Sequence, residues 1–510
     1  MGHAMSSTAS RTLIGGVSAL GLMTLAVLGA VPPTGSATLS ADVVAAPAAG
    51  TYTAPVPADL SALSWSDAFD ALHAKLASEY AFTEWKGLDW AALHQEYQPQ
   101  IAHAEDTGDP SAYYLALRAY VHELRDGHVS ITDDDDLLQD MAGGGFGLIA
   151  SSLASGRVAA TWVKPGGPAA RAGIATGARI VAWDGAPVRR ALAATSTVLG
   201  PQQPTDARRA SERLRFLVRA PIGAARVVSF VNPGGTRRTV TLTAVEDGLE
   251  TLVLTDGRSV ISTSGIPRRM VEHSILPGNI GYVRVLAEID LPDELPGDHT
   301  PTLTQFRSAM GSFIRAGVGG VIIDVRSNSG GSDQMVADML GSFSRKPSFY
   351  EYQNYVVPET GGFQIWVGDD VTGEYGRPGR GIRVRPAPEV YAGPVVALVN
   401  NGCISSGEGV AMGIRRLPQG EVVGFQGTNG SFGMVGDGVL LPGGIQVGWP
   451  FGQSLGEDKV VQIDSRGGRG GILPDRPIPM TLRNAVRSLA GADVELEYGL
   501  RALARLARAS

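Results

Sequence analysis

The sequence contains a single cysteine, Cys403, among its 510 residues. One cysteine excludes an intrachain disulfide, so the fold must be held by its own hydrophobic core. Basic residues are in the minority: 43 lysines and arginines stand against 50 aspartates and glutamates, which gives a net charge of -7. That balance offers no overall basic footprint for nucleic acid. The histidines and the cysteine lack metal-ligand spacing, and we expect neither a metal nor a cofactor.

The length of the chain predicts two or three domains, because 510 residues exceed one compact core. Hydrophobic residues make up 44% and charged residues 18%, as in ordinary soluble globular proteins. The 67 glycines cluster in short runs without a repeat. This distribution indicates tight turns and sites lined by backbone.

Residues 1–37 have the pattern of a secretory signal peptide. Arg11 precedes an apolar run from Leu13 to Val31, and small residues follow. We therefore expect export to the periplasm, the cell surface or the medium. An uncleaved membrane anchor is the alternative, because the run approaches the length that spans a bilayer. Residues 38–58 are rich in Ala, Pro, Thr and Ser, which is typical of a linker.

The rest of the chain divides into regions of different periodicity. Residues 59–142 form a predicted helical domain, because apolar side chains recur every three or four positions from Trp65 to Tyr80. Residues 143–246 are predicted to be rich in strands, with a short helix at 169–172. They also contain an arginine-rich helix near 208–219, whose polar face we expect to be solvated. From 250 to 490 strands and helices alternate, and residues 491–510 form a C-terminal helix.

Two apolar runs in the third region, "GVIIDV" and "PVVALVN", fit buried strands of a parallel sheet. These runs therefore predict an α/β core with crossover helices. The second run ends at Val399 and passes through a polar turn into a helix that begins at Ser405 or Ser406. Free N–H groups at a helix start stabilise negative charge, which suits a nucleophile and part of an oxyanion hole. A serine there can equally be an ordinary N-cap.

Two further segments could complete such a site. The first run leads into the paired glycines Gly330 and Gly331, which let backbone N–H groups approach an oxyanion. A plain strand-to-helix turn is the alternative. His128 follows a turn at Asp126 and Gly127, and a neutral imidazole can serve as the general base for a serine. A lone histidine also often has a structural role.

Together these segments resemble the C-terminal processing, or tail-specific, serine peptidases, including the tricorn-core type. The motifs occur in the family's order: "DGH" at 126–128, "DVRSNSGG" at 324–331, "SSGE" at 405–408 and "GILPD" at 471–475. Residues 143–245 resemble the family's PDZ domain. The resemblance implies an α/β fold with a ClpP/crotonase-like peptidase core, a PDZ-like β-rich domain and a small helical N-terminal domain.

The resemblance also implies roles for individual residues. Ser405 attacks the scissile carbonyl, and the N–H of Ser406 and one from Gly330 or Gly331 form the oxyanion hole. A loop in the PDZ-like domain captures the C-terminal carboxylate of a protein or peptide substrate. That loop consists of Gly145, Phe146, Gly147 and Leu148.

One position departs from the family's Ser-Lys pattern. Gly430 stands where the lysine is expected, and none of the five lysines lies in that turn: Lys75, Lys86, Lys164, Lys346 and Lys459. The tricorn-like members use a Ser-His-acid arrangement instead. Resemblance to them makes His128 the base and Asp464 the orienting acid, with Asp475 and Glu408 as less favoured alternatives.

The sequence therefore predicts an exported serine peptidase that acts on proteins or peptides through an acyl-enzyme. Two other hypotheses remain open. One is an inactive peptide-binding scaffold of the same fold, because the usual lysine is missing. The other is an acyl-transfer enzyme on a crotonase-like core, although the sequence has no obvious nucleotide or coenzyme A site. We expect no nucleic-acid partner, and contact with a membrane only through an uncleaved N-terminus.

Overall fold

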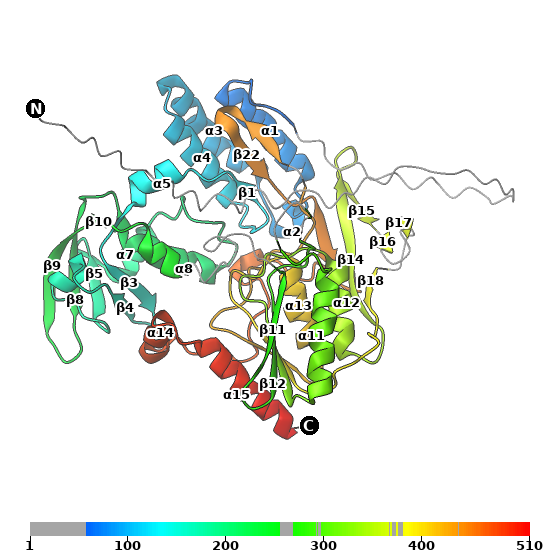
Figure 1. The fold of residues 1–510 in the computed structure, drawn as a ribbon. Coiled ribbons are helices and arrows are strands. Elements are labelled where there is room, and N and C mark those ends of the chain that lie inside the picture. Colours follow the sequence, from blue (N-terminus) through cyan, green and yellow to red (C-terminus); the bar gives the residue numbers. More distant parts are fainter. Residues whose placement is uncertain are drawn as a thin grey trace, which may run out of the picture.

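The computed structural model in Figure 1 describes residues 58–255, 269–291, 293, 297–366, 368–369, 374–375, 381–436 and 438–509. The predicted signal peptide and residues 38–57 of the predicted linker lie outside these ranges. No helix within them is long and apolar enough to cross a membrane. A helical domain lies at the top of Figure 1, a β-rich module at the left and an α/β core at the lower right.

The helical domain consists of α1 (Trp65–Glu79), α2 (Thr83–Lys86), α3 (Trp90–Thr107), α4 (Pro110–His122) and α5 (Asp135–Ala142). Four of these helices begin at a capping side chain that accepts a backbone N–H three residues further on, namely Ser64, Asp89, Asp109 and Asp134. The predicted apolar spacing in α1 is confirmed, because Phe69, Leu72 and Leu76 are fully buried. Helix starts and helix faces are thus explained by local sequence.

The core of this domain is completed by a hairpin from much later in the chain. Strands β21 (Val439–Leu441) and β22 (Ile445–Gly448) pair and bury their apolar side chains in the same cluster as α1, α3 and α4. The short strand β1 (Ser130–Ile131) pairs antiparallel with β22. The segment that carries His128 is therefore fastened to residues about three hundred positions away.

The β-rich module has a main antiparallel sheet in the order β3-β4-β5-β8-β9. Its strands are β3 (Leu148–Ser152), β4 (Val158–Val163), β5 (Arg179–Trp183), β8 (Ala225–Val231) and β9 (Arg237–Thr243), and β6 (Ala186–Pro187) pairs with β5. A second sheet joins β10 (Val245–Glu246), β2 (Gly144–Gly145) and β7 (Arg219–Ala220). The helices are α6 (Pro168–Arg171), α7 (Val188–Ala194), α8 (Asp206–Leu217) and α9 (Glu250–Thr255). The predicted short helix is thus α6.

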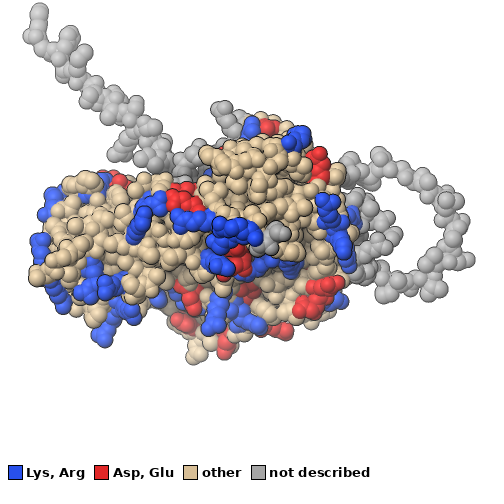
Figure 2. Space-filling view, turned by 90° about the horizontal axis from the view of Figure 1, so that it is seen from below, with Lys and Arg blue, Asp and Glu red and all other residues tan. Residues whose placement is uncertain are grey.

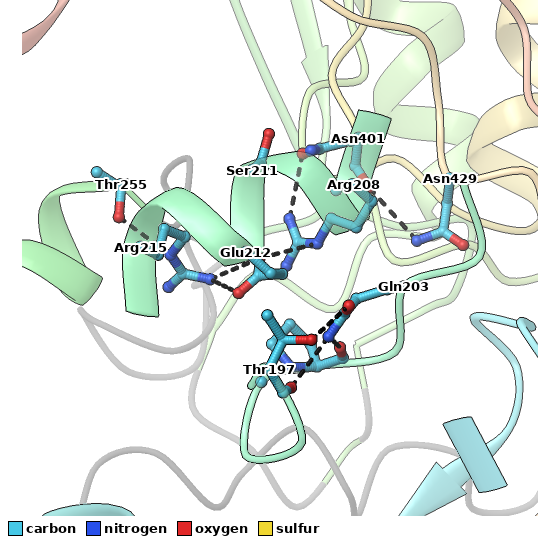
Figure 3. A network of polar contacts seen from close by, with 12 residues as sticks. Thr197, Gln203, Arg208, Ser211, Glu212, Arg215, Thr255, Asn401 and Asn429 are labelled. Carbon is cyan, nitrogen blue, oxygen red and sulfur yellow. Dashed lines mark hydrogen bonds and ion pairs between the residues drawn. The ribbon is translucent and has the colours of Figure 1, made fainter. Parts of the chain in front are cut away.

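The prediction of a solvated arginine-rich helix face at 208–219 is wrong. Glu212 of α8 is fully buried and pairs with both Arg208 and Arg215 (Figure 3). The side chain of Arg219 is also buried and pairs with Asp247. Charge spacing alone does not distinguish an exposed charged helix from one whose charges pair inside the protein.

Exposed arginines are numerous elsewhere in the module: Arg157, Arg171, Arg179, Arg189, Arg190, Arg237 and Arg238. In Figure 2, basic side chains are spread over the side that the module occupies in Figure 1. This module therefore has a basic surface, although the net charge of the whole chain is negative.

The α/β core has a sheet in the order β11-β12-β13-β19-β20. These strands are β11 (Val271–Leu276), β12 (Ile280–Val285), β13 (Gly320–Asp324), β19 (Val395–Leu398) and β20 (Gly420–Val423). The two predicted apolar runs are β13 and β19, and their parallel pairing is confirmed.

Successive residues of β13 face opposite layers of the core. Val321 and Ile323 face the cluster formed with α11 (Thr302–Ala316), α12 (Asp333–Leu340) and α13 (Ser406–Arg415). Ile322 faces α15 (Val494–Ala509), so the predicted C-terminal helix forms the second layer of the core. Helix α14 (Leu482–Leu489) packs against β4 of the β-rich module.

A second core sheet contains β14 (Ser348–Val357), β15 (Gly362–Trp366), β18 (Ile382–Val384) and β23 (Gly452–Leu455). Strands β16 (Gly368–Asp369) and β17 (Glu374–Tyr375) form a separate pair. Short 3-10 helices lie at Gly341–Phe343, Pro442–Gly444 and Arg466–Gly468.

We predict that Arg326→Leu destabilises the core. The side chain of Arg326 is 15% exposed. Its guanidinium pairs with Asp324 at the end of β13 and with Asp493 and Glu495 at the start of α15. Removing it leaves the buried Asp324 carboxylate without its cation, which typically costs about 3 kcal/mol of unfolding free energy. Urea unfolding measures this loss. The exposed substitution Arg237→Leu is the control, and equal stability of the two variants would contradict the prediction.

Candidate active site

Ser405 occupies a strained backbone position between β19 and α13. Its φ is 58° and its ψ is -133°, a combination that non-glycine residues rarely adopt. Its side chain makes no capping hydrogen bond, so Ser405 is not an ordinary N-cap. The hydroxyl of the next residue, Ser406, already has acceptors: it donates to Gly331 O at 2.8 Å or to Asp333 Oδ1 at 2.7 Å. Strain at a strand-to-helix turn is the geometry that exposes the nucleophilic serine in α/β-hydrolases.

The two glycines after β13 lie against this serine. A Cβ on Gly330 would stand 2.5 Å from the Ser405 Cβ, and the φ of Gly330 is +83°, so only glycine fits there. The N–H of Gly330 donates to Asn328 Oδ1 at 2.8 Å and is therefore occupied. Neither the Ser406 amide nor the Gly331 amide donates to a backbone oxygen of the described residues. Between the two glycines, Gly331 is therefore the better candidate for an oxyanion donor.

His128 lies in a turn that is anchored beside Ser405. The turn closes with Val129 N donating to Asp126 O, and the His128 amide donates to Asp126 Oδ1 at 2.9 Å. A Cβ on Gly127 would lie 2.9 Å from Cδ1 of Ile404, the neighbour of Ser405. The structure thus brings the two predicted catalytic segments together. The described residues show no hydrogen bond between His128 and Ser405, and such bonds are often long before substrate binds.

Ser431 joins these segments, and the sequence analysis missed it. Its carbonyl oxygen accepts from the Ser405 amide at 3.0 Å, and its Oγ accepts from the Gly127 amide at 2.7 Å. Its own amide donates to Glu408 Oε1 at 2.8 Å. A lone serine directly after an Asn-Gly pair carries no motif that could have identified it.

Glu408 holds the whole turn that contains Ser431. Its other oxygen accepts from Thr428 Oγ1 at 2.5 Å and from the Gly430 amide at 2.8 Å. Burial raises the pKa of Glu408 to about 8, and these hydrogen bonds oppose the rise. This carboxyl group therefore organises the turn from Thr428 to Ser431, and the described residues show no hydrogen bond between it and His128.

The carboxylate of Asp464 bonds groups other than His128. Asp464 Oδ1 accepts from the Trp85 indole at 2.7 Å and from the Arg466 amide at 2.6 Å. Its Oδ2 lies 3.4 Å from the ammonium group of Lys86. Asp475, the other alternative, bonds Arg415 and the Val422 amide. Within the described part of the chain, neither carboxylate bonds the imidazole of His128.

The electrostatic environment keeps His128 neutral. Burial is the main cause that lowers the pKa of His128, the Lys86 ammonium adds to this, and the Asp126 carboxylate opposes it. A general base must be unprotonated before it accepts a proton. The imidazole is thus in the required form at neutral pH.

The predicted carboxylate-binding loop borders a cavity of about 230 Å³ in the β-rich module. Gly145 and Gly147 line it together with Lys164 and Arg171. Phe146 points elsewhere, because its ring is fully buried against Trp183 with a centroid distance of 5.6 Å. Its backbone is also engaged, since its amide donates to Val218 O and its carbonyl oxygen accepts from the Ala169 amide, so Phe146 does not line the cavity as predicted.

Comparisons with known proteins place these residues in a wider context. Residues 279–475 match the family model described as peptidase family S41. Two structures of mature CPAF, one of them complexed with lactacystin, align with TM-scores of 0.61 and 0.60 at 17% identity. The alignments cover 88% of this chain and 98% and 99% of those chains, and at this identity they show a shared fold alone. No curated protein sequence matches significantly.

A second carboxyl group, Glu288, is buried behind the two glycines. Its Oε1 accepts from Asn328 Nδ2 at 2.8 Å, and its Oε2 has no partner in the described structure. Burial raises the pKa of Glu288 to about 8, with a smaller contribution from Asp333. The protonated form therefore predominates at neutral pH.

We predict that Glu288→Gln weakens the pH dependence of stability. Between pH 5 and 8 the folded protein retains a proton on Glu288 that the unfolded chain releases, so the unfolding free energy falls as pH rises. The neutral glutamine removes this contribution. Urea unfolding at several pH values compares the slopes of the two proteins. Glu272→Gln, on the exposed face of β11, should keep the original slope, and an unchanged slope in Glu288→Gln would refute the prediction.

Proposed function

We propose that this chain, which carries a peptidase family S41 segment at residues 279–475, is a serine peptidase that cleaves peptide bonds in proteins or peptides. One observation carries the proposal: the strained, uncapped Ser405 lies against Gly330, within the matched segment. The turn that holds His128 lies beside it, although it precedes the matched residues. The family match also favours a peptidase over a crotonase-type acyl transferase.

In the proposed reaction, Ser405 Oγ attacks the scissile carbonyl carbon while His128 accepts its proton. The amides of Ser406 and Gly331 stabilise the oxyanion of the tetrahedral intermediate. The carbon–nitrogen bond then breaks, and His128 returns the proton to the leaving amine. Water attacks the resulting acyl-enzyme by the same proton transfers in reverse order.

We include recognition and export in the proposal. The cavity beside Gly145 and Gly147 receives the C-terminal carboxylate of a substrate, in the manner of a PDZ domain. Arg171 and Lys164 on its lining supply positive charge for that carboxylate, although Glu246 and Asp247 line the same cavity and Lys164 pairs with Glu250. Export rests on the signal-like sequence of residues 1–37.

An inactive peptide-binding protein of the same fold is the second candidate. The glycine at position 430 and the missing hydrogen bond between His128 and Ser405 in the described structure favour it. Both candidates predict binding of peptides, and they differ in covalent chemistry at Ser405.

A fluorophosphonate probe distinguishes the two candidates. We expect the purified chain to be labelled at Ser405, to hydrolyse unstructured protein, and to lose both properties in Ser405→Ala. His128→Ala should lower the hydrolysis rate by about a hundredfold or more, because general-base catalysis contributes 10²–10⁴-fold. Mass spectrometry of the labelled peptide identifies the modified residue.

The outcomes separate the roles of the two residues. Activity that survives Ser405→Ala would reject the nucleophile, and full activity in His128→Ala would reject the base. A folded protein that is neither labelled nor active supports the binding-protein candidate.

We also predict that recognition depends on a free C-terminus. Fluorescein-labelled peptides with randomised C-terminal residues should bind the Ser405→Ala variant at least about tenfold more tightly as free acids than as amides, because a charge-assisted hydrogen bond contributes about 1.5–3 kcal/mol. Arg171→Gln should reduce this preference, whereas the exposed Arg237→Gln should not. Fluorescence anisotropy measures the affinities, and equal binding of acids and amides would exclude carboxylate recognition.

A further inference from the structure

Two side-chain atoms near the proposed catalytic residues are buried without a hydrogen-bond partner in the described structure. They are Nδ1 of His128 and Oδ1 of Asn429. Buried polar atoms in folded proteins nearly always have a partner, so each exception requires an explanation. These two atoms have complementary chemistry, since a protonated imidazole nitrogen donates and an amide oxygen accepts.

Asn429 is fixed between the two catalytic segments. Its amide donates to Cys403 O at 2.8 Å, and its Nδ2 lies 3.4 Å from Asn401 O. Figure 3 shows this nitrogen directed toward Asn401 and the oxygen turned away from it. That oxygen packs against Gly127, so closely that a Cβ at Gly127 would overlap it. The unpartnered oxygen therefore lies at the turn that carries His128.

The other candidate acceptors, the carboxylate oxygens of Asp126 and Asp464, each already accept a hydrogen bond or pair with a cation. Asp126 Oδ1 accepts from the His128 amide, and Asp126 Oδ2 accepts from the hydroxyl of Tyr80 and from Lys86. The Asp464 carboxylate serves Trp85, Lys86 and the Arg466 amide, as described above. Among these candidates, Asn429 alone retains an unoccupied oxygen.

The surrounding turn holds Asn429 in place. Glu408 binds the residue before it, Thr428, and the two residues after it, Gly430 and Ser431. An orienting group must be held rigidly to select one position of an imidazole ring. This turn meets that requirement.

We propose that Asn429 is the positioning residue of His128: the two atoms are not hydrogen-bonded to each other in the described structure, and they pair, with Asn429 Oδ1 accepting the Nδ1–H, when His128 acts as the base. This inference rests on the proposed peptidase function. The hydrogen bond keeps the proton on Nδ1, so the lone pair of Nε2 accepts the proton of Ser405 Oγ during attack. The resulting imidazolium passes that proton to the leaving amine, and Asn429 itself gains and loses none.

An amide acceptor has a consequence that a carboxylate lacks. It carries no charge, so it does not favour the imidazolium form as an aspartate does. The ionic groups that act on His128 are Asp126 and Lys86, and Lys86 also pairs with Asp464. Replacing Asn429 by aspartate therefore adds one new charge next to the ring and leaves the existing groups unchanged.

Steady-state kinetics of two variants test the inference. Asn429→Ala should lower kcat by about a hundredfold with KM within about twofold, because the base loses its orientation and substrate contacts remain. Asn429→Asp should recover most of kcat and move the acidic limb of the pH–rate profile to higher pH. Ser211→Ala is the matched control, since its hydroxyl on α8 accepts from Gln426 in the same region and has no contact with His128. Its kinetics should match the parent enzyme.

A second measurement is independent of activity. Nitrogen-15 NMR of the histidine-labelled chain should show the His128 proton on Nδ1 in the parent protein and a mixture of tautomers in Asn429→Ala. Thermal unfolding establishes that both variants are folded. A parent enzyme that is labelled by fluorophosphonate, together with unchanged kcat in Asn429→Ala, would overturn the inference and leave the peptidase function intact. If the parent enzyme is not labelled, the proposed function fails, and an unchanged tautomer in Asn429→Ala then overturns the inference separately.

Discussion

The buried carboxyl group of Glu408 determines the geometry on which the rest of the site depends. It binds three donors on the turn from Thr428 to Ser431. Ser431 then bonds the amides of Ser405 and Gly127, so a single turn sets the positions of the nucleophile and of the histidine segment. Hydrogen bonds are strong in such a buried environment, and leaving one unmade is costly. This turn is therefore the scaffold that positions the nucleophile segment and the histidine segment relative to each other.

Hydrophobic packing supplies a second constraint on the same site. The helical domain is completed by the hairpin of β21 and β22, and β1 pairs with that hairpin just after His128. The base segment is therefore anchored in the packing of the helical domain, whereas the nucleophile segment packs in the core cluster through Cys403 and Val410. Helix α8 adds a third contact, since Arg208 reaches Asn401 on the turn before Ser405 (Figure 3). All three parts of the chain thus meet at one place.

Local sequence predicted the elements whose structure depends on nearby residues. The apolar runs became the parallel strands β13 and β19, and the spacing in α1 matched its buried face. The strand-to-helix position of Ser405 and the paired glycines beside it were also readable. The buried face of α8 could not be predicted, because the charged residues that form the ion pairs of Glu212 have the same spacing as those of an exposed charged helix. Ser431 and Asn429 belong to no motif, since their partners lie far away along the chain.

The sequence by itself determined which segments are strands and helices, and it narrowed the chemistry to a serine without a nearby lysine. These properties depend on periodicity and residue type, which act within a few positions. Only the tertiary structure decided which groups surround that serine. In it, Asp464 accepts a hydrogen bond from Trp85, and the N–H of Gly330 donates to Asn328. It also left the oxygen of Asn429 unoccupied beside the turn of His128. Hydrogen-bond partners are assigned by three-dimensional proximity and by competition for each donor, and neither is contained in the spacing of residues along a chain.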